Sequence, residues 1–199
     1  MIEQSDFQFN LVQSLQRFKP KTIAETSSYA AVLVPVLLER EPEILLTVRS
    51  AHLKSHPGEV SFPGGMYEPA DATQAQTALR ETHEEVGVEP RFFKTIGQLS
   101  PVVSRAGFRV FPIVAIADKP LQTHANEDEI AEIFTVPWQF FATEKPELKK
   151  VSRGSMQFYM PHFYFENKHI WGLTAMVLLE LVNLVEGTDW PLPDFSEYS

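Results

Sequence analysis

The sequence predicts an α/β protein in which helices cover a sheet, because β-rich runs and helical segments follow one another along the chain. Residues 71–86 and 171–186 place apolar side chains at helical spacing, which predicts two strong helices. At 199 residues, 44% of them hydrophobic, the chain has one ordinary core and no obvious room for a second domain. The strand candidates are residues 29–38, 44–49, 92–100, 108–117 and 156–165.

An N-terminal part, a main domain and a short tail are predicted. In the N-terminal part Phe7, Leu11 and Leu15 recur at steps of three and four, which predicts a short amphipathic helix that Pro20 closes. The last residues contain two prolines and read as irregular chain. The boundaries are 1–28 for the N-terminal helix and linker, 29–189 for the main domain and 190–199 for the tail.

Three local features shape the predicted sheet. The four polar residues 39–42 separate the first two strand candidates, which predicts a hairpin. Residues 52–69 then form a long irregular stretch rich in Pro and Gly, and such loops in compact domains are often functional. Pro112 lacks an amide hydrogen, so the candidate strand 108–117 is expected at a sheet edge or a bulge.

Composition excludes several classes of function. With no cysteine the chain has no disulfide, thiolate metal site or cysteine nucleophile, which is compatible with a reducing cytoplasm. A formal charge of −9 disfavours a broad nucleic-acid-binding face, and a small anionic substrate would need local cations or a metal. The polar N-terminus does not resemble a signal peptide, and the apolar runs are too short to span a bilayer. We therefore expect a soluble cytoplasmic protein with no membrane partner.

The helix predicted at residues 71–86 carries the clearest chemical pattern. Asp71 is expected to cap its start and Gly87 to end it. Glu81, Glu84 and Glu85 fall on one side at spacings of three and four, opposite an apolar stripe. On its own this is the pattern of a solvated acidic face. A divalent cation with a preference for oxygen ligands would turn the repelling carboxylates into a binding site.

A glycine pair in the preceding loop changes that interpretation. Alone, Gly-Gly most often marks a turn. Read together with the helix, it resembles the Nudix box, a glycine followed by Arg-Glu-x-x-Glu-Glu-x-Gly and an aliphatic residue. The residues that carry the resemblance are Gly65, Arg80, Glu81, Glu84, Glu85, Gly87 and Val88. Asp71 stands where the box has a glutamate, the stretch from Gly65 to Arg80 is one residue longer, and Thr82 replaces a bulky aliphatic residue.

A second signature lies upstream and resembles the motif of the coenzyme A branch of Nudix hydrolases. It is formed by residues 45–50, Lys54, Gly58 and residues 62–65, with Lys54 in place of the family's arginine. Residues 171–175, Trp-Gly-Leu-Thr-Ala, also resemble that branch. The resemblance covers about residues 29–185. It implies an α/β/α sandwich with a mixed central sheet, and a Nudix hydrolase domain at residues 29–189.

The resemblance also implies a reaction. Members of this branch hydrolyse the pyrophosphate bond of coenzyme A or its derivatives to 3′,5′-ADP and 4′-phosphopantetheine with Mg²⁺ or Mn²⁺. Glu81, Glu84 and Glu85 would hold the metal and Arg80 would orient them. The general base would be a box glutamate, such as Glu84, or an acid of residues 127–129, among which Glu129 is favoured.

The substrate-binding residues implied by the resemblance lie mainly in the long loop. The Gly64-Gly65 turn would set this loop against the substrate, and Arg49 and Lys54 would bind its phosphates. Arg105 and Arg109, on either side of Gly107, are second choices. The aromatic residues of segment 156–165 are expected in the core or in a homodimer contact rather than in a base-stacking platform.

Three alternatives remain open at this stage. One is a Nudix hydrolase of another nucleoside diphosphate compound, such as ADP-ribose or a dinucleotide. Another is a non-catalytic Nudix-like module that binds a nucleotide, although such modules usually lose box carboxylates and all three are present here. The last is a purely structural acidic helix in an unrelated α/β domain. Each of the first two implies a small-molecule nucleotide partner and no nucleic acid.

Overall fold

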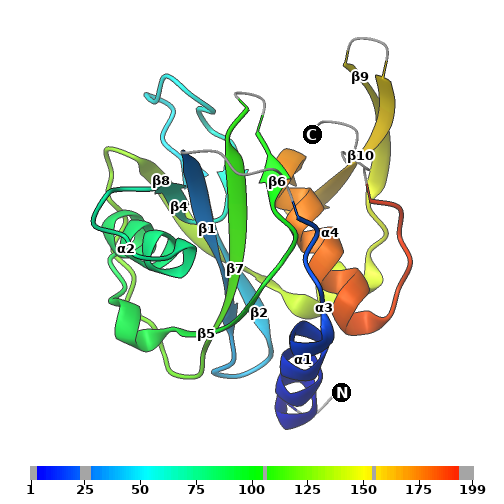
Figure 1. The fold of residues 1–199 in the computed structure, drawn as a ribbon, viewed down its shortest axis with the longest axis horizontal. Helices are drawn as coiled ribbons and strands as arrows, with labels where there is room; N and C mark the ends of the chain where they lie inside the picture. Colours follow the sequence, from blue (N-terminus) through cyan, green and yellow to red (C-terminus); the bar gives the residue numbers. More distant parts are fainter. Residues whose placement is uncertain (1–3, 23–27, 105–106, 154–155, 193–199) are drawn as a thin grey trace.

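The computed structural model describes residues 4–22, 28–104, 107–153 and 156–192. It confirms a layered α/β fold built on a mixed sheet (Figure 1). The sheet runs in the order β3-β2-β1-β7-β5, while β4 also pairs with β1, β6 with β7 and β8 with β2. Its strands are β1 Tyr29–Leu37, β2 Glu43–Arg49, β3 Val60–Ser61, β4 Gly64–Met66, β5 Lys94–Gln98, β6 Val102–Val103, β7 Arg109–Ala117 and β8 Ile130–Pro137. Strands β1 and β7 are parallel, and β1 pairs antiparallel with β2 and β4.

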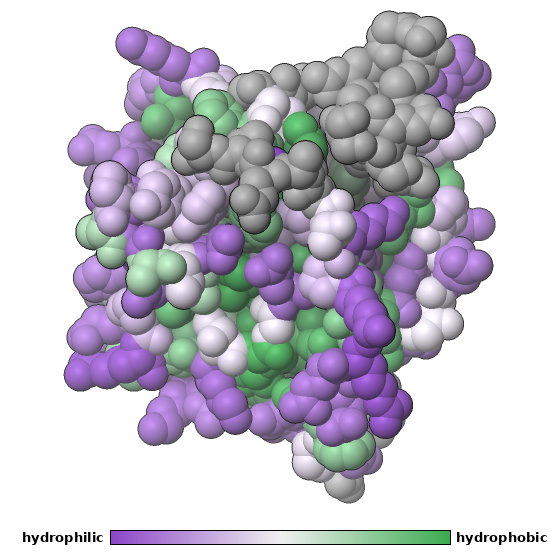
Figure 2. All heavy atoms as spheres, viewed as in Figure 1, coloured by the Kyte–Doolittle hydropathy of each residue, from purple (hydrophilic) through white to green (hydrophobic). Residues whose placement is uncertain are grey.

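Helices cover both faces of this sheet. Helix α2 (Gln74–Val86) lies on one face, and α4 (Gly172–Glu186), α1 (Gln4–Arg17) and α3 (Trp138–Thr143) lie on the other (Figure 1). Alternation along β1 serves both layers, because Ala31 and Leu33 share a core with α2 whereas Val34 and Val36 share one with α4. Polar side chains cover much of the face seen in Figure 2, with apolar ones visible between them. The predicted sandwich is confirmed.

Helix α1 is confirmed and belongs to the main core. Its buried residues Phe7, Leu11 and Leu15 pack within the cluster that contains α4. The Phe7 ring lies 5.2 Å from the ring of Trp138. Asn10 donates to the carbonyl of Val185 at 2.8 Å. The predicted division into three parts stays a prediction. Over the described ranges, no helix combines the length and apolar character needed to cross a membrane.

A second sheet stands beside the first and is here called the side sheet. It has the order β11-β10-β9 and is antiparallel, with bounds β9 Glu147–Arg153, β10 Met156–Phe165 and β11 Lys168–Ile170. In Figure 1 its β9 and β10 strands rise next to α4. Strand β10 has the bounds predicted from the sequence, whereas β9 was not predicted. Its charged residues hide the alternation on which a strand prediction depends.

The expected edge position of Pro112 is wrong. Strand β7 lies inside the sheet, between β1 and β5. The carbonyl of Pro112 accepts from Leu99 N at 3.0 Å, in the interval where β5 has ended at Gln98 and β6 has not begun. A residue's amide and carbonyl lie on the same side of a strand, so the missing N–H of Pro112 faces a gap in the neighbouring strands. A proline is therefore tolerated in an inner strand.

Helix α2 also begins later than predicted. Thr73, not Asp71, caps it, and the Thr73 hydroxyl accepts from Gln76 N at 3.2 Å. Gln76 completes the cap by accepting from Ala72 N at 2.6 Å. The predicted stop is correct, since Gly87 has a φ of 76° and its N–H donates to the carbonyl of His83. Asp71 is thereby freed for another role.

Candidate active site

Two glycines of β4 let helix α2 lie directly against the strand. A Cβ atom on Gly65 would lie 2.4 Å from the carboxyl carbon of Glu81. One on Gly64 would lie 2.4 Å from the carbonyl oxygen of Ala31 in the paired strand β1. Real Cβ atoms do not approach other atoms below about 3 Å, so a side chain at Gly64 would meet fixed backbone and one at Gly65 would displace the Glu81 carboxylate. The glycine pair therefore allows the backbone of β4 to lie close to the carboxylates of helix α2.

Glu85 is buried, which corrects the expectation that it lies on an open helix face. Its exposure is only 2%. Gly64 N donates to Glu85 Oε2 at 3.0 Å, and Arg49 Nη1 lies 3.6 Å from Oε1. Burial raises the pKa of Glu85 to about 7, although the Gly64 N–H and Arg49 act in the opposite direction and Glu81 and Glu129 add repulsion. A buried carboxylate with so little compensation is suited to bind a cation.

Glu81 sits in a similar environment. Burial raises the pKa of its carboxyl group, Arg80 opposes that effect, and the charges of Glu84 and Glu129 reinforce it. Its side chain is 15% exposed, whereas that of Glu84 is 52% exposed. The three box carboxylates thus range from buried Glu85 to solvent-facing Glu84.

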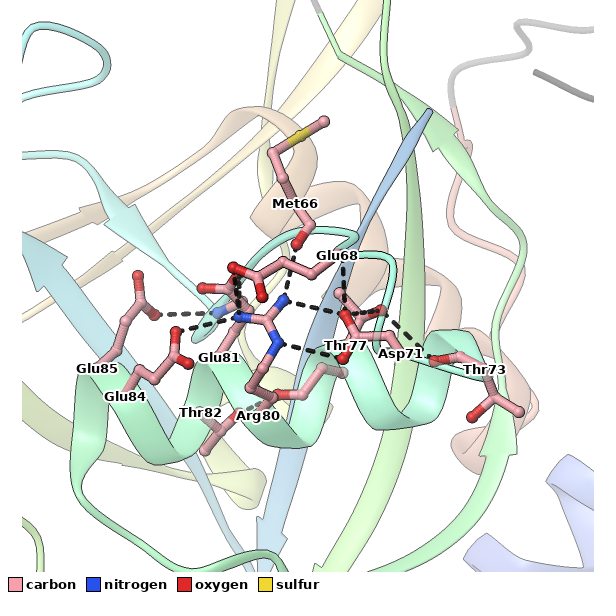
Figure 3. Close-up of polar contacts among 12 residues, drawn as sticks. Met66, Glu68, Asp71, Thr73, Thr77, Arg80, Glu81, Thr82, Glu84 and Glu85 are labelled. Atoms are coloured by element: carbon pink, nitrogen blue, oxygen red, sulfur yellow. Dashed lines mark hydrogen bonds and ion pairs between the residues drawn. The ribbon is translucent and has the colours of Figure 1, made fainter. Parts of the chain in front are cut away.

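Arg80 fills the space between the helix and the preceding loop (Figure 3). Its Nε donates to Asp71 Oδ1 at 3.2 Å, and Nη2 donates to Asp71 Oδ2 at 3.0 Å and to the Met66 carbonyl at 2.9 Å. Its Nη1 donates to Glu81 Oε1 at 3.0 Å and to Glu84 Oε2 at 3.1 Å. These bonds match the five N–H donors of a guanidinium group. Arg80 is therefore a positioning residue whose hydrogen bonds are all committed within the protein.

Asp71 is the anchor of Arg80, and the sequence interpretation missed this role. Hydrogen bonds from Arg80 lower the pKa of Asp71 to about 2, and Thr77 Oγ1 also donates to Asp71 Oδ2 at 2.9 Å. Asp71 in turn raises the pKa of Arg80. One signal was available: Asp71 follows Gly65 by six residues, where the Nudix box has an acid.

The loop before β8 brings Glu129 toward the helix carboxylates. His124 N donates to the carbonyl of Val86 at 2.8 Å, and Asn126 N donates to that of Glu85 at 3.0 Å. The carbonyl of Glu129 accepts from Ser50 N at 2.7 Å, which ties the loop to the end of β2. Of the three acids at 127–129, Glu129 is the one whose charge raises the pKa values of both Glu81 and Glu85.

Comparison with known proteins decides the family. The model of the NUDIX domain matches residues 28–157. The chain belongs to the Nudix family. It is 37% identical to the uncharacterised Nudix hydrolase NudL of Yersinia enterocolitica, over 86% of this chain and 88% of that protein. It is 38% identical to NudL of Photorhabdus laumondii, over 94% of this chain and all of that protein. As a Nudix hydrolase it is a pyrophosphohydrolase of small nucleotide compounds, and the family generally uses a divalent cation such as Mg²⁺ or Mn²⁺.

Among solved structures, the Caenorhabditis elegans Ap4A hydrolase binary complex resembles this Nudix chain with a TM-score of 0.47 and 22% identity. That match covers 55% of this chain and 80% of the other. The Nudix hydrolase RenU from M. Smegmatis has a TM-score of 0.45 and 22% identity, over 57% of this chain and 71% of the other.

The Nudix carboxylates suit a hard divalent cation. Glu81, Glu84 and Glu85 would offer oxygen ligands from one helix, and burial raises the pKa of both Glu81 and Glu85. Within the described ranges, no three acidic or histidine side chains already converge as a closed cation site. Figure 3 shows Arg80 bonded to Glu81 and Glu84. Glu85 instead accepts a hydrogen bond from Gly64 N.

A cavity of about 860 Å³ opens beside the Nudix glycines. Arg49, Gly64 and Gly65 line it at the carboxylate end, so these three predicted substrate residues are brought together. Much of its remaining wall is apolar and comes from β1, β6, β10 and α4. The side sheet contributes Lys149 and His162.

Two other predicted cations, Lys54 and Arg109, are not part of the cavity wall. Lys54 is exposed on the loop after β2 and is not part of the cavity wall. Arg109 is buried in β7, where its neighbours in the sheet are Tyr29 and Val103. Arg105 lies outside the described residues. Of the predicted phosphate-binding cations with a described position, only Arg49 lies at the site.

Proposed function

We propose that this Nudix hydrolase cleaves the pyrophosphate bond of coenzyme A, or of its derivatives, to 3′,5′-ADP and 4′-phosphopantetheine. The single observation that carries the proposal is the continuity of the carboxylate site with the large cavity. Glu85 accepts a hydrogen bond from Gly64 N and lies near Arg49, and both Gly64 and Arg49 line the cavity. Upstream of Gly64, the loop carries the signature that resembles the coenzyme A branch.

The size and lining of the cavity support this substrate over a simple nucleotide. Ligand sites for whole cofactors typically occupy about 300–1,000 Å³. A cavity of about 860 Å³ accommodates a long substrate, and a mostly apolar wall suits the uncharged pantetheine arm. ADP-ribose and dinucleotides, the alternatives within the reaction class, carry a sugar or a second nucleotide in place of that arm. They match the apolar wall less well.

Each residue has a defined task in the proposed reaction. The cation, Mg²⁺ or Mn²⁺, would neutralise diphosphate charge and lower the pKa of bound water. Glu81, Glu84 and Glu85 would hold it, and Arg80 would fix the first two carboxylates through Nη1. Glu129 would accept the proton of the attacking water. Arg49 would bind a substrate phosphate, and the backbone of Gly64 and Gly65 would border it.

Several predicted features stay predictions. Lys54 and Arg105 are still proposed as further phosphate-binding cations: Lys54 lies on the exposed loop after β2, which ends at Arg49, and Arg105 lies outside the described residues. Glu84 remains an alternative general base. Homodimer formation and a cytoplasmic location also stay predictions.

Product analysis tests the proposal. The full chain is incubated with Mg²⁺ or Mn²⁺ and, separately, with coenzyme A, ADP-ribose and diadenosine polyphosphates, and the products are identified by mass. We expect 3′,5′-ADP and 4′-phosphopantetheine from coenzyme A at the highest kcat/KM. Faster cleavage of ADP-ribose or a dinucleotide would reject the substrate and keep the reaction class. Tight nucleotide binding without cleavage under any divalent cation would support a binding module instead.

The Glu85→Gln variant links that activity to the site. Glutamine keeps the size of the side chain and its bond with Gly64 but removes the charge that would hold the cation. We expect kcat to fall by about 10²–10⁴-fold while the circular dichroism spectrum is preserved. Glu39→Gln, an exposed carboxylate in the turn after β1, is the matched control and should leave kcat unchanged. Normal turnover in Glu85→Gln would contradict the site assignment.

A further inference from the structure

Four flat rings, those of His162, Tyr164, His169 and Trp171, lie nearly parallel to one another in and next to the side sheet. The ring centres of Tyr164 and His169 lie 4.7 Å apart with planes 5° from parallel, and those of His169 and His162 lie 5.0 Å apart at 17°. His162 and Trp171 continue the series at 6.0 Å and 7°. His162 and Trp171 also line the cavity. Phe163 of β10 lies in the core, as expected from the sequence, whereas His162 and Trp171 face the cavity.

A hydrogen bond joins the two imidazoles edge to edge, in nearly one plane. His162 Nδ1 lies 2.7 Å from His169 Nε2, and His162 is only 7% exposed. Burial lowers the pKa of both imidazoles, and the positive charge of Lys149 adds to the effect. At neutral pH the two rings are therefore uncharged and share one N–H between them. Neutral parallel rings suit stacking with another flat ring.

A lysine of the adjoining strand β9, Lys149, contacts the outermost of these rings. Lys149 Nζ donates to the Tyr164 hydroxyl at 2.7 Å and lies 3.5 Å from Glu147 Oε2. An ammonium group has three N–H donors, and these two contacts occupy at most two of them among the residues described. Lys149 also lines the cavity, and its side chain is 44% exposed. The hydrogen bond with Tyr164 fixes the position of the Lys149 ammonium group, which still has an N–H donor for an anion.

We propose that the side sheet binds the nucleoside end of the substrate, with Lys149 on the ribose 3′-phosphate and the base against the rings of His162 and Trp171. This proposal rests on the proposed function and assigns the two ends of the substrate. A nucleoside 3′-phosphate combines a flat ring with an anion, which matches flat rings beside a lysine. The pantetheine arm has neither a ring nor a charge, and it is left to the apolar wall formed by Val103, Leu173 and Met176.

Discrimination between coenzyme A and 3′-dephospho-coenzyme A tests the role of Lys149, because the two substrates differ only in that phosphate. A charge-assisted hydrogen bond predicts a kcat/KM ratio of about 10–100 in favour of coenzyme A. In Lys149→Met the ratio should approach one, because kcat/KM should fall for coenzyme A and stay constant for 3′-dephospho-coenzyme A. Lys94→Met, which removes an exposed lysine from β5, should retain the full ratio.

Binding of the products gives a readout that needs no turnover. The wild-type chain should bind 3′,5′-ADP about 10–100 times more tightly than 5′-AMP, and Lys149→Met should bind both equally. Stacking should also quench the fluorescence of Trp171, so Trp171→Phe should lose this quenching while keeping a ring. Tyr164→Phe keeps the ring but removes the oxygen that orients Lys149, and it should reduce the ratio only in part.

The outcomes separate the inference from the proposed function. Equal kcat/KM for both coenzymes in the wild-type chain, or an unchanged ratio in Lys149→Met, would overturn the assignment of Lys149 and leave the reaction intact. Unchanged quenching in Trp171→Phe would overturn the stacking of the base. Cleavage of neither coenzyme, with turnover of another pyrophosphate, would reject the proposed substrate; a retained preference for 3′,5′-ADP over 5′-AMP would then still support Lys149.

Discussion

Arg80 and Asp71 form a two-point contact across the start of helix α2, with Nε to Oδ1 at 3.2 Å and Nη2 to Oδ2 at 3.0 Å. The contact aims the remaining donors of Arg80 at Met66 and at two box carboxylates. Asp71 is 5% exposed at its side chain and Arg80 21%. Because the guanidinium group is planar and rigid, the contact with Asp71 also fixes the direction of Nη1. Asp71 thereby sets the positions of Glu81 and Glu84, which it does not touch.

Replacement of Asp71 by asparagine should therefore affect both stability and catalysis. The amide of the new side chain would donate where an acceptor is needed, leaving Arg80 partly unpaired. We expect the free energy of unfolding to fall by about 2–3 kcal/mol in urea titrations. The value of kcat should also fall, by about 10-fold or more, because Glu81 and Glu84 lose their fixed partner.

The control is Asp118→Asn, which removes one carboxylate from an exposed position just after β7. Its unfolding midpoint and kcat should match the wild type. An Asp71→Asn chain with wild-type stability and turnover would show that Arg80 is oriented by its other contacts.

The two glycines of β4 should fail in different ways when each is replaced by alanine. At Gly65 the added methyl group meets the side chain of Glu81, which can move, so the fold should persist while the carboxylate is displaced. At Gly64 it meets the backbone of Ala31 and Val32, which cannot move without breaking the sheet. We expect Gly65→Ala to lose Mn²⁺ affinity at near-normal stability, and Gly64→Ala to lose stability.

Calorimetric Mn²⁺ titration and thermal unfolding measure these two effects separately. Gly107→Ala is unsuitable as a control because Gly107 has a φ of +84°, in the left-handed region. Ala72→Gly, at an exposed position before α2, is a better control for a one-methyl change. Equal Mn²⁺ affinity in Gly65→Ala and the wild type would remove Glu81 from the metal shell.

Much of the fold follows from local periodicity. The bounds of β10 match those predicted, and α4 begins one residue after the predicted start. The β1–β2 hairpin is confirmed through the pair Val36 and Ile44. In contrast, β8 was not among the strand candidates because Glu132 interrupts its apolar pattern, and its register comes from pairing with β2. Pairing between distant strands is not encoded in the spacing of one segment.

The candidate site also has features that the sequence predicts and features that it does not. Its carboxylates, glycines and Arg80 were identifiable because the Nudix box fixes their spacing within one segment. The burial of Glu85 could not be predicted from the sequence, since it depends on Gly64 approaching the helix after β4 pairs with β1. The cavity joins residues more than 100 positions apart, the rings of residues 162–171 come together only when β10 pairs with β11, and Lys149 lies on a strand that showed no clear pattern.

The buried carboxylate of Glu85 should make the metal-free protein less stable as pH rises. Its pKa is raised to about 7 in the folded state, from an ordinary value of 4.5. The folded chain therefore binds the proton more tightly than the unfolded chain, and this contribution is complete below about pH 4.5 and lost by about pH 7. We expect Glu85→Gln in EDTA to gain up to about 3 kcal/mol relative to the wild type between pH 5 and pH 8.

Urea unfolding at a series of pH values measures that difference. Glu84→Gln, which removes a half-exposed carboxylate from the same helix, is the matched control. Added Mg²⁺ should stabilise the wild type at pH 8 and have little effect on Glu85→Gln, because the cation favours the ionised carboxylate. A difference between wild type and Glu85→Gln that stays constant across this pH range would contradict the buried, weakly compensated state of Glu85.

Glu129 is the last residue to test, because its position near Glu81 and Glu85 is compatible with two roles. As the general base it would act in the chemical step without holding the cation. Glu129→Gln should then lower kcat by about 10²–10⁴-fold while Mn²⁺ affinity stays within a few-fold of the wild type. As a metal ligand it would instead lower Mn²⁺ affinity first. Glu127→Gln and Asp128→Asn, on the same exposed loop, are the controls and should keep normal turnover. A normal kcat in Glu129→Gln, with kcat lost in Glu84→Gln at unchanged Mn²⁺ affinity, would move the proton acceptor to the Nudix helix itself.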